Sequence, residues 1–431
     1  MIFTLYLCPP QIISVKILIK NIKTIVQANP ATTTKVSGTE MAILPCINNG
    51  WITTEDDKIA GIGEMKEGLP AESHFDHIIN AEGQFAFPCW CDSHTHIVYA
   101  GSREGEFVDR IKGLSYEEIA KRGGGILNSA EKLNKASEDE LFESARKRLH
   151  EMAMNGTGAV EIKSGYGLSF DGEIKMLKVI QRLKHHTDMT IKATFLGAHA
   201  VPLKYKQNRQ EYVDLLINEM LPFIGYEKLA DYCDVFCDKG FFTPDETDSI
   251  LKAAAKYGLL PKIHANELDF SGGIQVGVKN NALSVDHLEY TGDEEIKVLM
   301  NSSTMPTLLP STAFFLGLKY PPARKMIDAG LPVALASDYN PGSSPSGKMA
   351  FVLSLACVKM KMLPEEAINA ATINSAYAMG LSNSHGNIKV GSRANLFLTH
   401  PISHYNYLPY SFGSDLIHTV IIGGKLYRHQ N

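Results

Sequence analysis

The pattern of apolar and polar positions changes twice along the chain. Residues 15–87 predict short strands, because stretches such as VKILIKNIKTIV (15–26) alternate apolar and polar side chains. A similar pattern returns after Gly380, in NIKVGSRANLFLTHP and DLIHTVIIGGKLYR. We therefore expect the two ends of the chain, residues 1–87 and 390–431, to form one small composite β-sandwich domain.

Between these ends, residues 88–389 alternate short apolar runs with amphipathic helical patterns. Ser137 begins a capping box ahead of one helical pattern, and Thr243-Pro244 opens another. Eight apolar runs have the length of buried strands: 89–96, 158–167, 190–200, 231–238, 261–267, 282–290, 304–310 and 332–340.

Eight strand–helix units in sequence predict an α/β fold, a closed parallel (β/α)8 barrel of the TIM type. A doubly wound open sheet is the alternative. Such a sheet would usually carry a glycine-rich phosphate loop, and the chain contains neither G-x-G-x-x-G after a strand nor a P-loop sequence. The barrel is therefore the favoured architecture.

Polar residues follow the predicted strands. His94 and His96 are two positions apart, so on a strand their side chains point to the same face. The carboxyl ends of barrel strands share one mouth, where catalytic groups gather. We therefore expect the following residues to meet there: His94, His96, His199, His264, Glu267, Asp286, His287 and Asp338.

The chemistry of these residues fits one metal ion. Three imidazoles and a carboxylate, from His94, His96, His264 and Asp338, suit Zn²⁺ or Fe²⁺ and leave a position for water. Each residue alone also has a structural explanation, such as a turn for Asp338. Their recurrence at five strand ends favours a site, because buried polar groups need partners.

Composition narrows the possible partners. The 431 residues carry a net charge of −5, so we expect no nucleic acid, and no long uncharged apolar run predicts a membrane span. Met1–Ser14 contains Pro9-Pro10 and no basic start, which favours an extension or a first strand over a signal peptide. Cys233 and Cys237 are predicted to be buried free thiols, and the odd cysteine count indicates a reducing compartment, the cytoplasm.

These motifs resemble the metal-dependent amidohydrolase superfamily, which carries H-x-H on its first strand, histidines on strands 5 and 6, and aspartate on strand 8. Finer motifs are similar to the imidazolonepropionase family of histidine degradation. They are DSHTH followed by Arg103, KSGYGL (163–168), LGAHAVP (196–202), HANEL (264–268) and SDYNPGSSP (337–345). The resemblance extends from about residue 15 to the end of the chain.

The resemblance implies a reaction, the hydrolytic ring opening of 4-imidazolone-5-propanoate to N-formimidoyl-L-glutamate. It implies one divalent or trivalent metal ion per subunit, zinc or iron, and a homodimer. The implied metal ligands are His94, His96, His264 and Asp338. The implied catalytic residues are Glu267, His287 and Asp338, and the implied substrate-binding residues are Arg103, Tyr166, His199, Glu267, Asn340, Gly342 and Ser343.

The residue chemistry agrees with this substrate, because the planar guanidinium of Arg103 suits a carboxylate. The sequence leaves open which of Asp338, His287 and Glu267 is the first base. Two rival hypotheses are an amidohydrolase that acts on a purine or pyrimidine and an inactive barrel that serves as an interaction scaffold. Arg103 with Tyr166 argues against the first, and a complete set of ligands argues against the second.

Overall fold

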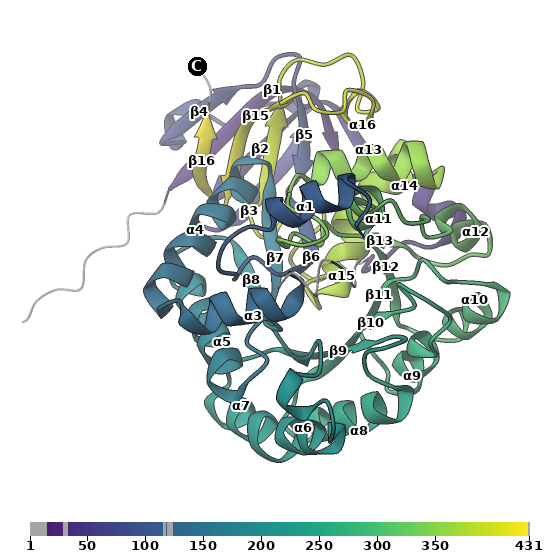
Figure 1. Ribbon diagram of the computed structural model, residues 1–431. Helices are drawn as coiled ribbons and strands as arrows, with labels where there is room; N and C mark the ends of the chain where they lie inside the picture. The colour runs from purple at the N-terminus through teal and green to yellow at the C-terminus, as the bar shows by residue number, and fades with distance from the viewer. Residues whose placement is uncertain (1–14, 29–32, 115–117, 119–123, 430–431) are drawn as a thin grey trace, which may run out of the picture.

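The computed structural model describes residues 15–28, 33–114, 118 and 124–429. The prediction for Met1–Ser14 lies outside this range. Figure 1 shows a barrel ringed by helices, with a mixed sheet at one side in which the purple N-terminal and yellow C-terminal strands lie together. In the described part of the chain, no helix is long and apolar enough to cross a membrane.

The barrel prediction is confirmed. Among the described residues, eight parallel strands follow one another in hydrogen-bonded order, and each overlaps one predicted run. The strands are β6 (Trp90–Thr95), β7 (Thr157–Lys163), β8 (Thr190–Ala198), β9 (Tyr232–Cys237), β10 (Leu260–Ala265), β11 (Ser284–His287), β12 (Met305–Leu308) and β13 (Ala334–Leu335).

The barrel closes between the first strand and the segment after the last one. Thr95 and Tyr339 form a parallel bridge, and the backbone N–H of His96 donates to the carbonyl of Tyr339 at 2.9 Å. The N–H of Asp338 donates to the carbonyl of His94 at 3.0 Å. Closure therefore takes place at the residues that the sequence singles out as metal ligands.

Both predicted helix starts are confirmed. Ser137 caps α4 (Glu138–Met154) and Thr243 caps α8 (Pro244–Ala255), each in a capping box. The other α-helices in the described residues are α1 (Glu104–Ile111), α3 (Ile126–Lys135), α5 (Phe170–Lys184), α6 (Arg209–Leu215), α7 (Leu221–Glu227), α9 (Gly273–Lys279), α10 (Asp293–Met300), α11 (Pro310–Leu316), α12 (Ala323–Asp328), α13 (Met349–Met360), α14 (Pro364–Asn369), α15 (Ser375–Ala378) and α16 (Tyr407–Tyr410).

The two ends of the chain pair with each other, as predicted, and their strands form one mixed sheet. The antiparallel pair of β5 (Phe85–Pro88) and β14 (Leu396–Thr399) joins the N-terminal strands to the C-terminal ones. The order is β16-β15-β14-β5-β1-β2-β3, with β4 against β1. The remaining strands are β1 (Lys16–Val26), β2 (Cys46–Glu55), β3 (Lys58–Glu64), β4 (His77–Asn80), β15 (Ile417–Ile422) and β16 (Lys425–His429).

Stacked aromatic side chains join this sheet to the barrel. The Phe397 ring lies 5.2 Å from the Phe87 ring and 5.0 Å from the Trp90 ring, and all three side chains are buried. The chain passes from β5 into β6 across this cluster, only a few residues before His94. The mixed sheet therefore anchors the strand that carries the H-x-H pair.

Candidate metal centre and active site

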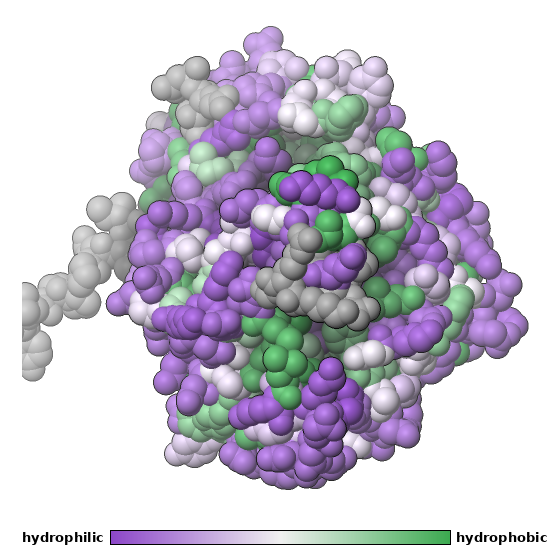
Figure 2. Space-filling view, in the orientation of Figure 1, coloured by the Kyte–Doolittle hydropathy of each residue, from purple (hydrophilic) through white to green (hydrophobic). Residues whose placement is uncertain are grey.

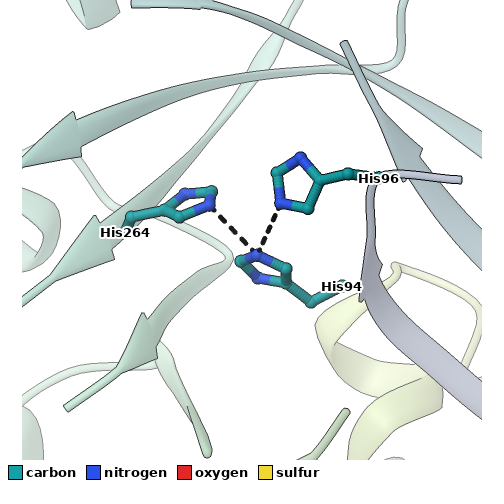
Figure 3. A group of neighbouring side chains, drawn as sticks. All are labelled: His94, His96 and His264. Atoms are coloured by element: carbon teal, nitrogen blue, oxygen red, sulfur yellow. Dashed lines mark hydrogen bonds between the residues drawn. The ribbon is translucent and has the colours of Figure 1, made fainter. Parts of the chain in front are cut away.

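Three histidine side chains point toward one another inside the barrel (Figure 3). His94 Nε2 lies 3.1 Å from His264 Nε2 and 3.3 Å from His96 Nε2. All three residues are at most 3% exposed. Burial is the largest cause that lowers the pKa of His94 and of His96 well below the usual value, so these rings are neutral and able to bind a metal ion.

Two of these rings are oriented by carboxylates on neighbouring strands. His94 Nδ1 lies 2.6 Å from Asp286 Oδ2, and His264 Nδ1 lies 3.1 Å from Asp234 Oδ1. An ionised carboxylate only accepts hydrogen bonds, so each Nδ1 carries the hydrogen and each Nε2 keeps its lone pair. This is the tautomer that a metal ligand requires.

The carboxylate of Asp338 completes the group. Its Oδ1 lies 3.6 Å from His94 Nε2 and 3.5 Å from His96 Nε2, and Thr312 Oγ1 donates to its Oδ2 at 2.5 Å. The Nε2 lone pairs of His94 and His264 lie beside the Nε2 atom of His96 and the carboxylate of Asp338, a group of donor atoms that a cation would satisfy. The residues therefore fit a metal ion, with a donor set that suits zinc or iron.

Backbone geometry is unusual at this centre. Asp338 has φ of +53° and His287 has φ of +83°, a region that L-residues rarely adopt. Asn266, between His264 and Glu267, has φ of +54°. Such conformations concentrate at functional sites, where the surrounding structure fixes them.

A cavity of about 570 Å³ opens above the centre. Figure 2 shows that the face of the molecule over the barrel is largely hydrophilic, with apolar side chains near its middle. His94 and Asp286 are not in the cavity wall, because Asp286 lies buried behind His94. The other predicted site residues line it: His96, Arg103, Tyr166, His199, His264, Glu267, His287, Asp338, Asn340, Gly342 and Ser343. The structure thus brings the predicted residues together, while their roles stay proposals.

His199 and Tyr166 form one wall of the cavity. The His199 ring stacks on the His96 ring at 5.5 Å, and His199 Nδ1 lies 3.0 Å from the carbonyl of Gly165. Gly165 has φ of +108°, and a Cβ there would lie 2.9 Å from His199 Nδ1. Glycine at this position therefore lets the histidine approach the backbone.

Two arginines also line the cavity, and the sequence analysis missed one of them. Arg103 Nη2 contacts Glu106 Oε2 at 2.5 Å, and Arg110 Nη1 donates to the carbonyl of Gly342 at 3.0 Å. Both arginines line the cavity. Their spacing of seven residues, two turns along α1, was the available signal.

Asn340 organises the loop after β13. Its Oδ1 accepts the backbone N–H groups of Gly342 at 2.7 Å and Ser343 at 2.8 Å. Its Nδ2 donates to Ser343 Oγ at 2.8 Å and to the carbonyl of Asp338 at 2.7 Å. These N–H groups are therefore engaged within the loop. Arg103 and Arg110 are the cationic side chains among the described residues that line the cavity.

Two carboxyl groups approach the Nδ1 atom of His287. Glu267 Oε2 lies at 3.6 Å and Glu289 Oε2 at 4.0 Å. Burial, followed by the charge of Asp338, raises the pKa of Glu267 to about 8. Glu289, which the sequence analysis also missed, is buried, and neither of its oxygens has a hydrogen-bond partner among the described residues. Its position two residues after His287 was the only signal.

The cysteine prediction is confirmed for the described residues. Cys233 and Cys237 on β9 are buried and free, and burial raises the pKa of both thiols. They are therefore packing residues of the strand rather than metal ligands.

Comparison with known proteins agrees with this geometry. Residues 85–427 match the amidohydrolase family. The imidazolonepropionase of Flavobacterium johnsoniae is 59% identical over 409 residues, which cover 95% of this chain and 99% of the relative. The chain belongs to the imidazolonepropionases of the amidohydrolase family. It is thus a hydrolase.

More distant members of the family agree. The imidazolonepropionase of Alkaliphilus oremlandii is 42% identical over 417 residues, covering 96% of this chain and 98% of the relative. Two solved structures show the same fold. Escherichia coli guanine deaminase has a TM-score of 0.73 at 14% identity, over 97% of this chain and 100% of its own. Atrazine chlorohydrolase from Arthrobacter aurescens has a TM-score of 0.69 at 16% identity, over 96% of this chain and 95% of its own.

The raised pKa of Glu267 predicts how stability depends on pH. In protein stripped of metal, Glu267 holds its proton in the folded state up to about pH 8, whereas its ordinary value is 4.5. The folded state then binds more protons than the unfolded state, so stability falls as the pH rises through this interval. We expect Glu267→Gln to melt at increasingly higher temperature than the wild type from pH 4.5 to about pH 8. Glu294→Gln, at an exposed position, is the control, and a flat difference for Glu267→Gln would contradict the shift.

Proposed function

We propose that this chain hydrolyses 4-imidazolone-5-propanoate to N-formimidoyl-L-glutamate. The observation that carries the proposal is one cavity with a three-histidine centre at its floor and two arginines in its wall. The histidine centre suits hydrolysis of the ring, and the two guanidinium groups suit binding of the propanoate carboxylate. The imidazolonepropionase relatives support the same substrate.

We also propose the metal and its ligands. His94, His96, His264 and Asp338 would hold one zinc or iron ion, because their donor atoms face one another and suit either metal. A bound ion of this kind lowers the pKa of water toward about 7, which supplies a nucleophile at neutral pH.

The propanoate would lie against Arg103 and Arg110. Both guanidinium groups reach the cavity, and a guanidinium pairs with a carboxylate through two parallel hydrogen bonds. Tyr166 and His199, which line the same cavity, would contact the ring. This arrangement places the ring over the histidine centre and fixes its direction.

The different pKa values of Asp338 and Glu267 suggest which of them acts as the base and which as the acid. Burial is the main cause that raises the pKa of Asp338 to about 6, and Glu267 reaches about 8, so at neutral pH Asp338 accepts a proton more readily and Glu267 already holds one. Asp338 would take the proton of the attacking water, while His287 orients that water or the ring carbonyl. As the carbon–nitrogen bond breaks, Glu267 would give its proton to the leaving ring nitrogen.

A homodimer and a cytoplasmic location remain proposals. The family resemblance supports the dimer. The free thiols of the described cysteines fit a reducing compartment.

The direct test supplies freshly generated 4-imidazolone-5-propanoate to the purified protein. We expect the ultraviolet absorbance of the ring to decay, formiminoglutamate to appear, and a chelator to stop both. A purine or pyrimidine substrate in parallel tests the rival amidohydrolase activity. If the protein holds a full metal equivalent and turns over only the purine or pyrimidine, the proposed substrate is wrong.

The division of roles predicts how two variants behave. Glu267→Gln removes proton transfer with little change in side-chain shape, and His287→Asn removes the imidazole that orients the water or the ring carbonyl. We expect each to lower kcat by at least about a hundredfold, with unchanged metal content. Metal analysis beside steady-state kinetics makes the measurement, and loss of the metal in either variant would contradict the assigned roles.

The close contact between Gly342 and Arg103 predicts a defect in substrate binding. A Cβ at Gly342 would lie 2.2 Å from Arg103 Nη1, so the guanidinium must move. We expect Gly342→Ala to raise KM by about tenfold or more, because a charge-assisted hydrogen bond is weakened, with little change in metal content.

Gly105→Ala is the matched control for this variant. A Cβ at Gly105 meets no atom within 4 Å among the described residues, and the position lies on the same helix as Arg110. Equal KM values for Gly342→Ala and the control would rule out the proposed position of the substrate carboxylate.

A further inference from the structure

A fully buried network of charged side chains lies inside the barrel beneath the histidines. Its members are 0% exposed and come from four strands: Glu161 and Lys163 on β7, Asp234 on β9, Lys262 on β10 and Asp286 on β11. Three carboxylates against two ammonium groups leave one net negative charge. Burying five charges is costly unless each is paired, so a network of this size needs a reason.

Lys163 is the branching point of the network. Its Nζ lies 2.7 Å from Asp234 Oδ2, 3.7 Å from Asp286 Oδ2 and 2.5 Å from Glu161 Oε1. Burial acts to lower the pKa of Lys163, but the carboxylates outweigh it and raise the pKa above the ordinary value. The side chain is therefore an ammonium ion at neutral pH.

The two aspartates that Lys163 contacts are those that orient the metal-site histidines. Asp234 uses its other oxygen, Oδ1, for His264 Nδ1 at 3.1 Å. Asp286 uses Oδ2 for His94 Nδ1 at 2.6 Å. One ammonium group is thus linked through two carboxylates to two imidazoles on different strands.

Lys262, the second buried lysine, has different contacts. It pairs with Glu161 and donates to the carbonyls of Ser93 at 3.1 Å and Ala378 at 3.3 Å. It contacts neither Asp234 nor Asp286 through any of these bonds. The two lysines share burial, charge and Glu161, but only Lys163 forms ion pairs with the carboxylates behind the histidines; Lys262 acts on Asp286 through its charge alone.

We propose that Lys163 is a positioning residue of the metal centre, which holds Asp234 and Asp286 in place so that His264 and His94 present Nε2 to one point. This inference rests on the proposed metal site and not on the identity of the substrate. It gives a role to the first residue of the KSGYGL motif, which the cavity itself does not explain.

The sign of the effect separates positioning from simple charge. A buried ammonium near a bound cation repels it, so loss of Lys163 would tighten metal binding if its charge were all that mattered. If Lys163 positions the ligands, its loss weakens binding. Substitutions behind metal ligands weaken affinity about 10- to 100-fold in other proteins.

The experiment measures zinc release from loaded protein in excess chelator, followed with a colorimetric zinc indicator. The variants are Lys163→Met, Lys262→Met, Asp286→Asn and the Lys163→Met/Asp286→Asn double variant. We expect Lys163→Met to release zinc about 10- to 100-fold faster than the wild type, and Lys262→Met to stay near the wild-type rate. In the double variant, the rate of zinc release should rise by less than the product of the two single increases, because both substitutions act on the same histidine.

Folding is checked by the melting temperature of each metal-free variant. Lys163→Gln replaces Lys163→Met if the latter does not fold. Its amide keeps a donor for Asp234 but loses the ammonium group that pairs with Asp286, so zinc release should still be faster than in the wild type, by a smaller factor. Unchanged or slower zinc release in a folded Lys163 variant overturns the proposal, as does equally fast release in Lys262→Met. A wild type that binds well under one equivalent of both zinc and iron overturns the metal site and this inference together, whatever the substrate.

Discussion

The hydrogen bonds that close the barrel also assemble the candidate metal centre. Asp338 N–H bonds to the carbonyl of His94, and Ser337 Oγ donates to the buried carboxylate of Asp92 at 2.5 Å. Asp92 and His94 belong to the first barrel strand, whereas Ser337 and Asp338 follow the last one. If the barrel did not close, His94 and Asp338 would not face each other, so fold and site depend on one set of contacts.

Burial gives the centre its chemical character. Burial keeps the imidazoles of His94 and His96 neutral and able to bind a cation, while the buried carboxyl groups of Asp338 and Glu267 hold protons at higher pH than in water. The same low-polarity surroundings make unpaired charges costly, which explains why ion pairs fill the interior beneath the histidines. Asp338 and Glu267, with pKa values of about 6 and about 8, acquire different proton affinities from their surroundings.

The mixed sheet at the side of the barrel holds one end of the strand that carries the H-x-H pair. Phe87, Trp90 and Phe397 pack where the chain enters β6, so segments from both ends of the sequence hold the strand that carries the H-x-H pair. The opposite end of that strand is fixed by closure against Tyr339. A strand restrained at both ends places two imidazoles with little freedom, which a metal centre requires.

The sequence by itself predicted the barrel, the pairing of the two chain ends and both capping boxes, because each depends on a periodic or local pattern. The histidines and Asp338 followed from their places at strand ends, whereas Arg103, Tyr166 and the loop after the last strand were named only through the family resemblance. Period-two alternation places His94 and His96 on one face, and strand ends share one mouth. Only the tertiary structure revealed Arg110 beside Arg103, Glu289 beside His287, and Lys163 behind two histidines. These contacts join distant strands or depend on where a loop turns, and their strength comes from burial. Neither the distance between two side chains in space nor their burial can be predicted from the residues next to them in the sequence.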